Sequence, residues 1–222
     1  MEKNPLERLY GVFAQSETYL NLLYLLLAFP LGLAYFIFLI TGISLGIGLL
    51  ILWVGFLILA GVLALSYPLT LFERQMAILL LHVDIPPMTQ PAQQPAATMF
   101  QQVKNHLANP VTWKGIAFLF LKFPIGLACF VITITLLSVS VGLTLAPLAY
   151  PWVHFNLMNW QINSMPAAAV ACVIGLVLTP LSLHAFNIIA KWMGLFARVM
   201  LGNNLPAPTE VQVPPAPAAP LS

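Results

Sequence analysis

Lys122 is the residue whose surroundings in the sequence most require a chemical explanation. It lies inside the apolar run FLFLKFPIG, and the predicted membrane spans contain no acid that could pair with it. A charge at the middle of a membrane costs at least about 2.5–3.5 kcal/mol. We therefore expect its long side chain to reach the headgroup layer. The alternative is a functional contact, in which Lys122 holds an anionic lipid headgroup or a freed backbone carbonyl.

His184 is a second polar side chain in apolar surroundings. It lies late in the last predicted span, with Ser182 and Asn187 nearby. A proton relay would need carboxylates inside the membrane, and the predicted spans hold none. A packed or interfacial histidine is therefore the simpler interpretation, and a lipid or polar contact is the functional one.

An aromatic loop precedes the last predicted span and contains Tyr150, Trp152, His154 and Trp160. Such a loop could dock a lipophilic ligand, and His154 could titrate near neutral pH. Tyrosine and tryptophan also form the ordinary aromatic belt at a membrane interface. The belt is the more usual role, and the loop is kept as a candidate input site.

Motifs for catalysis or cofactor binding are missing from the sequence. Cys129 and Cys172 lie in apolar stretches without the spacing of a metal site or a disulfide framework. The sequence has no nucleophile elbow, phosphate loop, zinc motif or dinucleotide fingerprint. A net charge of +2 without a basic patch gives no reason to expect nucleic acid. We expect neither an enzyme nor a cofactor, and no metal site.

The composition shows where such a chain must reside. Of its 222 residues, 60% are hydrophobic and only 6% are charged, and the mean hydropathy is +0.94. Soluble domains carry about a quarter charged residues. The chain is therefore predicted to be an all-α integral membrane protein that contacts membrane lipids.

One apolar unit occurs twice. Residues 29–34 (FPLGLA) return as residues 123–128 (FPIGLA), at an offset of 94 positions, since 124 − 30 = 94. The offset pairs Pro30 with Pro124, and Gly32 with Gly126. A proline inside a helix frees a carbonyl and bends the helix, so these four residues are candidate hinges. A static kink that lets the repeats pack is the simpler alternative.

The long uncharged run after residue 18 must contain two membrane spans, because one span needs about 20 apolar residues. We predict spans over 19–40 and 46–66, with a connection near 41–48 where glycines cluster. Tyr67-Pro68 should end or bend the second helix. An amphipathic helix over 69–82 is then expected to lie on the membrane surface, with Glu73 and Arg74 opposite its apolar face.

The second unit is predicted to contain spans over 116–137 and 166–187, and 188–201 should continue as a helix. The chain is predicted to begin with a cytoplasmic segment (1–18), followed by a first hairpin with an interfacial helix (19–82) and a cytoplasmic linker (83–112). A second hairpin with an interfacial helix (113–201) and a disordered Pro/Ala-rich tail (202–222) complete it. Lysine and arginine are absent from the two outer connections, so both termini should be cytoplasmic in a cell membrane. The two repeats are then parallel.

The motifs of the second unit resemble a known family. Residues 109–114 (NPVTWK), 123–126 (FPIG) and 138–143 (SVSVGL) resemble the putative sensor domain family of prokaryotic membrane proteins, as does Ile85-Pro86. The resemblance covers about residues 10–201. It implies a four-helix membrane domain of the kind often fused to histidine kinases, and it supplies no catalytic residues. The chain has asparagine and lysine where the family often has aspartate and arginine, and no output module follows.

These observations predict a stand-alone membrane sensor that detects an envelope or membrane stimulus and acts through protein contacts. Its expected partner is a separate signalling or membrane-complex protein, or a second copy of the chain in a homo-oligomer. Two alternatives remain open. The chain could be a structural or accessory subunit of a larger membrane complex, or a small oligomeric transporter.

Overall fold

Four long helices make up most of the computed structural model, which describes residues 11–86, 110–149, 155–157, 160–162 and 164–202. They are α2 (Ser16–Gly48), α3 (Val54–Leu81), α5 (Pro110–Thr144) and α7 (Met165–Leu201). Five short elements connect or precede them: η1 (Gly11–Ala14), η2 (Leu50–Leu52), α6 (Ala146–Ala149), and the antiparallel strands β1 (Phe155–Leu157) and β2 (Trp160–Ile162).

Each long helix is able to cross a membrane. The helices have 28 to 37 residues, and their most apolar windows have mean hydropathies of 2.0 to 2.4. At 1.5 Å per residue they measure roughly 42–56 Å, which exceeds the ~30 Å hydrocarbon layer. Helices of this length fit a bilayer by tilting. The predicted fold class, an all-α membrane protein with four spanning helices, is confirmed.

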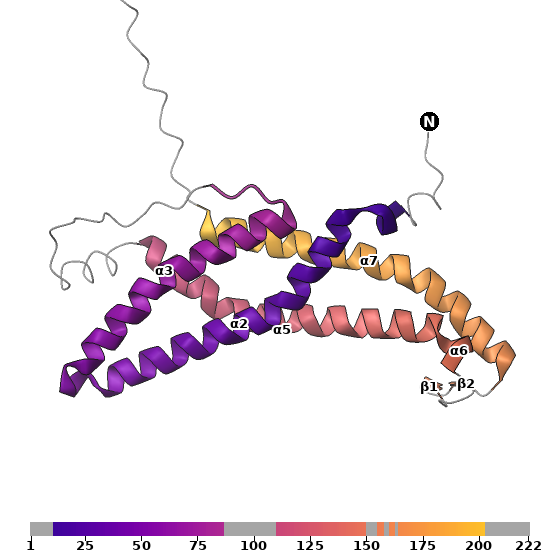
Figure 1. Ribbon diagram of the computed structural model, residues 1–222, viewed down its shortest axis with the longest axis horizontal. Coiled ribbons are helices and arrows are strands. Elements are labelled where there is room, and N and C mark those ends of the chain that lie inside the picture. The colour runs from indigo at the N-terminus through magenta and orange to yellow at the C-terminus, as the bar shows by residue number, and fades with distance from the viewer. Residues whose placement is uncertain (1–10, 87–109, 150–154, 158–159, 163, 203–222) are drawn as a thin grey trace, which may run out of the picture.

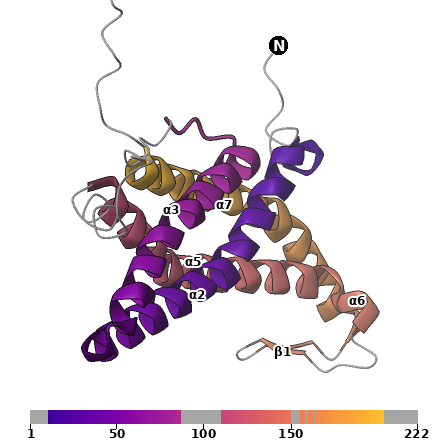
Figure 2. The ribbon, with the colours of Figure 1, turned by 60° about the vertical axis from the view of Figure 1, so that its left-hand side comes forward.

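The helices form two hairpins that cross each other (Figures 1 and 2). Helices α2 and α3 form one hairpin, and α5 and α7 form the other. The two tips lie on one edge of the molecule and point away from each other. The beginnings of α2 and α5 and the ends of α3 and α7 lie at the opposite edge, which is called the open edge below.

Two glycines allow α2 and α5 to cross backbone to backbone. A Cβ atom on Gly32 would lie 2.8 Å from the carbonyl oxygen of Lys122, and one on Gly126 would lie 2.5 Å from that of Ala28. Small residues at a crossing let membrane helices approach closely. The two contacts correspond at the 94-residue offset, since 32 + 94 = 126 and 28 + 94 = 122.

The aromatic rings beside the crossing correspond in the same way. Phe36 stacks on Phe123 with ring centroids 4.7 Å apart, and Phe29 lies 5.1 Å from Phe130. Adding 94 to 29 and 36 gives 123 and 130. Each helix therefore offers the other an equivalent surface at this point.

The first hairpin turn lies later than predicted. Helix α2 continues to Gly48, and the chain reverses over η2 and Trp53, whose φ is 61°. The predicted connection at 41–48 is therefore wrong. Gly42 and Gly46 lie within α2, where a Cβ would meet the side chains of Val62 and Leu59 of α3. These glycines serve the packing of two helices rather than a turn.

Residues 69–81 do not form the separate helix that was predicted, because they continue α3. Pro68 lies inside this helix on an exposed face. Ser66 and Thr70 donate to backbone carbonyls three residues earlier, at 2.7 Å each. The chain then turns at His82, and 83–86 folds back on the helix, where Arg74 binds the carbonyls of Ile85 and Pro86. In the second hairpin, 188–201 continue the helix of 166–187, as predicted, but they form no separate interfacial helix, because α7 is one helix from Met165 to Leu201.

The predicted N-terminal segment lies outside the described residues up to residue 10, as do linker residues 87–109 and tail residues 203–222.

Candidate functional site

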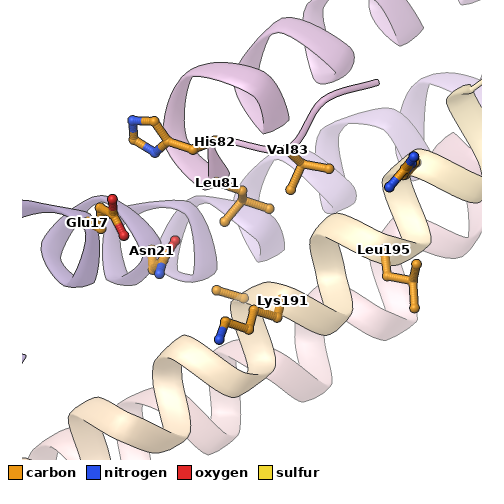
Figure 3. Close-up of a pocket in the computed structure, with 9 residues that line it drawn as sticks. Glu17, Asn21, Leu81, His82, Val83, Lys191 and Leu195 are labelled. Carbon is orange, nitrogen blue, oxygen red and sulfur yellow. The ribbon is translucent and has the colours of Figure 1, made fainter. Parts of the chain in front are cut away.

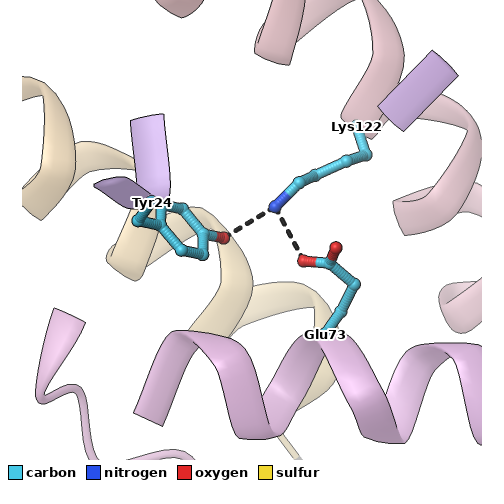
Figure 4. A network of polar contacts seen from close by, with 3 residues as sticks. All are labelled: Tyr24, Glu73 and Lys122. Atoms are coloured by element: carbon cyan, nitrogen blue, oxygen red, sulfur yellow. Dashed lines mark hydrogen bonds and ion pairs between the residues drawn. The ribbon is translucent and has the colours of Figure 1, made fainter. Parts of the chain in front are cut away.

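A buried charged contact joins three of the four long helices (Figure 4). The Lys122 ammonium on α5 lies 2.7 Å from Oε2 of Glu73 on α3, and it donates to the hydroxyl of Tyr24 on α2 at 2.7 Å. Lys122 and Glu73 are 0% exposed and Tyr24 is 2% exposed. The ammonium also lies 4.4 Å from the centroid of the Tyr24 ring. We call these three residues the buried triad.

Helical periodicity brings the triad together. On α3, the buried residues Ser66, Thr70, Glu73 and Ala77 recur every three or four positions, which places Glu73 on the inward face. On α5, Lys122 lies one turn before Gly126, at the crossing with α2. The backbone of Lys122 lies against Gly32 of α2, and its side chain reaches Tyr24, which lies two turns before Gly32 on the same helix.

The triad makes burial of the charges tolerable. Removing two ions from water costs several kcal/mol per ion, and this is recovered only with good geometry and further hydrogen bonds. Glu73 and Tyr24 occupy two of the three donors of the ammonium. The prediction that Lys122 reaches the headgroup layer is wrong, because the side chain is turned into the protein. It is fully enclosed, and its acid partner comes from a segment that was predicted to lie on the surface.

Two polar atoms beside the triad remain without a hydrogen bond. Among the described residues, Oε1 of Glu73 and the hydroxyl of Tyr35 are buried and have no such partner. Buried polar groups are rarely left unpaired, and each exception requires an explanation. Here a carboxylate oxygen that can accept and a hydroxyl that can donate are both available to a rearranged contact.

Further polar contacts hold α7 against its neighbours. Asn21 on α2 donates to the side-chain oxygen of Asn187 at 2.9 Å, and Asn187 donates to Thr18 at 3.1 Å. Between α5 and α7, the hydroxyls of Ser140 and Ser182 lie 2.8 Å apart. Membrane helices use such contacts because the lipid offers no hydrogen-bond partners.

The candidate hinge residues divide into two kinds. Pro30 and Pro124 lie on exposed faces of helices that continue through them. Gly32 and Gly126 are buried at the crossing, and Gly32 touches the backbone of Lys122 itself. The glycines therefore belong to the surroundings of the triad, whereas the prolines do not.

The remaining candidate site residues lie away from the triad or outside the described residues. His184 is half-buried on α7, and Trp160 begins β2. Tyr150, Trp152 and His154 lie outside the described residues. The residues that sequence reasoning missed are Glu73, Tyr24 and Tyr35. The spacing of Ser66, Thr70, Glu73 and Ala77 was the signal that could have identified Glu73 as inward-facing.

The triad holds three helices together. Comparison with known proteins then shows the family of the chain. No curated protein and no solved structure matches the chain. A family model described as "Putative sensor" matches residues 24–201, which is 178 of the 222 positions and includes every member of the triad. The chain therefore belongs to the putative sensor family.

Proposed function

We propose that this protein is a membrane sensor that relays a stimulus by rearranging its helices, and that the buried triad is the contact that changes. The observation that carries the proposal is the Lys122–Glu73 ion pair, 2.7 Å long and fully enclosed, in a domain whose helices are otherwise almost uncharged. Ionisable residues inside membrane domains are costly and are usually functional. Family membership supports the sensor role.

The triad suits a relay because it links elements that meet at one crossing. Glu73 lies two turns before the end of α3, and Lys122 lies at the glycine crossing of α5 with α2. Any change in the crossing must stretch or reorient the contact. The Glu73 carboxylate and the Tyr35 hydroxyl already lie close enough to interact, and neither Glu73 Oε1 nor this hydroxyl has a hydrogen bond of good geometry, so a small shift could exchange the contacts of the carboxylate. A relay needs two such discrete arrangements.

We propose that the open edge faces the cytoplasm of a cell membrane. Arg74, Lys114, Lys191 and Arg198 lie in the parts of α3, α5 and α7 that lead to this edge, whereas 42–53 and 138–164 contain no lysine or arginine. This asymmetry follows the positive-inside rule. Output would leave through the ends of α3 and α7 to a separate signalling protein, without catalysis by this chain.

The test compares three strains: one without the chain, one with the wild type, and one with Lys122→Met and Glu73→Leu together. The double substitution removes both charges and retains apolar volume, so the protein should reach the membrane in normal amount. We expect the wild type to co-purify with a kinase or transcription regulator. Both altered strains should lose the transcriptional response to a membrane or envelope stress.

Other outcomes would favour the alternatives. A silent deletion without a signalling partner would refute the relay. Recovery at fixed stoichiometry with a transporter or enzyme, unaffected by the double substitution, would indicate an accessory subunit. Substrate flux in liposomes containing only this chain would indicate a transporter.

A further inference from the structure

A cavity lined by both charged and apolar side chains lies near the open edge, apart from the triad (Figure 3). It has a volume of about 270 Å³ and lies between the start of α2, the end of α3 and the last third of α7. Glu17 and Asn21 line it from α2, His82 lies at the end of α3, and Lys191 and Arg198 line it from α7. We propose that this cavity binds the phosphate headgroup of an anionic phospholipid.

Among the described residues, the cavity has an excess of positive charge. Within the described part of the chain, no ion pair or hydrogen bond involves the side chains of Lys191, Arg198 or Glu17. Lys191 and Arg198 are seven positions apart and share one helix face. Two cations against one carboxylate favour an anion, and a guanidinium can bind phosphate through two parallel hydrogen bonds.

The wall of the cavity is a packed structure. At His82, φ is 52°, a left-handed conformation that turns the chain back towards α7. Val83 then lies against Gly194, where a larger residue would collide with it, and Ile85 is 1% exposed. Arg74 holds this returning segment through two backbone carbonyls. The cavity therefore has a defined boundary on the α3 side.

The surroundings indicate a lipid rather than a free anion. Leu81, Val83 and Leu195 contribute apolar surface to the cavity. Outside it, the same stretch of α7 exposes Trp192 at 71% and Val199 at 54%. Tryptophan beside lysine and arginine is typical of the membrane–water interface. A phospholipid can place its headgroup on the cations and its acyl chains on this apolar face, which inorganic phosphate cannot.

The inference is independent of the proposed signalling role and is tested by binding. The full chain is purified in a neutral detergent, and its thermal unfolding is followed with phosphatidylglycerol, phosphatidylcholine, glycerol phosphate or inorganic phosphate. We expect stabilisation by phosphatidylglycerol only. Lys191→Gln with Arg198→Gln should weaken that binding about tenfold, given a contribution of about 1 kcal/mol per basic residue and partial screening.

Two variants keep the result interpretable. Lys114→Gln removes an exposed cation near the open edge that does not line the cavity, and it should leave binding unchanged. Glu17→Gln removes the repelling carboxylate and should tighten binding. Equal losses from Lys114→Gln and the double variant would overturn the site, as would unchanged binding by the double variant. Equal stabilisation by inorganic phosphate would overturn the lipid as its occupant.

Discussion

Removing one partner of the buried triad should be far more damaging than removing both charges. Lys122→Met leaves the Glu73 carboxylate enclosed without a cation, because both side chains are 0% exposed. Breaking a buried pair in this way costs about 3–5 kcal/mol. Replacing both charges, with Lys122→Met and Glu73→Leu, should be neutral or stabilising by about 1–4 kcal/mol. Tyr24→Phe removes a hydrogen bond to a charged group and should cost about 1.5–3 kcal/mol.

The measurement is reversible unfolding in mixed micelles with increasing SDS, followed by fluorescence of the five tryptophans. A double-mutant cycle over Lys122 and Glu73 isolates their interaction from the effect of each side chain alone. Lys114→Met is the matched control, since Lys114 is exposed on the same helix, and its effect should stay within about 0.5 kcal/mol.

The outcome that would refute this reasoning is specific. If Lys122→Met destabilises the protein no more than the Lys114→Met control does, the lysine is solvated rather than enclosed. If the two single changes simply add in the double variant, Lys122 and Glu73 are not coupled. Either result would remove the physical basis for treating the triad as the contact that changes.

Two further predictions concern the crossing and the orientation. Gly32→Ala or Gly126→Ala should destabilise the protein by about 1–3 kcal/mol in the same unfolding assay, because the new methyl group meets backbone atoms of the other helix. Gly61→Ala, at a position with open space, should instead be neutral or stabilising by up to about 1 kcal/mol. In a cysteine-free background, Lys114→Cys should react with a membrane-impermeant thiol reagent only from the cytoplasmic side, and Trp53→Cys only from the opposite side. Reversed labelling would overturn the proposed orientation.

The sequence was sufficient to predict four spanning helices, since apolar runs of this length have few other solutions. It also identified Gly32 and Gly126, although as hinges rather than as a crossing. Both positions were found through the repeat, but a pattern along one chain does not say which helix lies against which. The backbone contact that defines their role depends on tertiary packing.

The triad was missed for a related reason. The helix after Pro68 was expected to have an apolar face with Glu73 and Arg74 opposite it, a pattern typical of a helix on the membrane surface. In the structure the helix continues through Pro68, and neighbouring residues of a helix point about 100° apart. Glu73 therefore faces inwards, while Arg74 holds the returning segment. Because the predicted break removed Glu73 from the membrane, Lys122 was left without its partner.

If the two hairpins rotate against each other, the glycine crossing is the natural pivot, because the backbones of α2 and α5 lie closest there. From Gly32 to the end of α2 there are 16 residues, and from Gly126 to the end of α5 there are 18, which gives arms of roughly 24 and 27 Å. A rotation of about 5° at the pivot would move each far end by about 2 Å, at arm lengths set by the helical rise. Such a rotation would displace the hairpin tips, which lie opposite the open edge, and under the proposed function it would be one way for strain in the lipid to reach the triad.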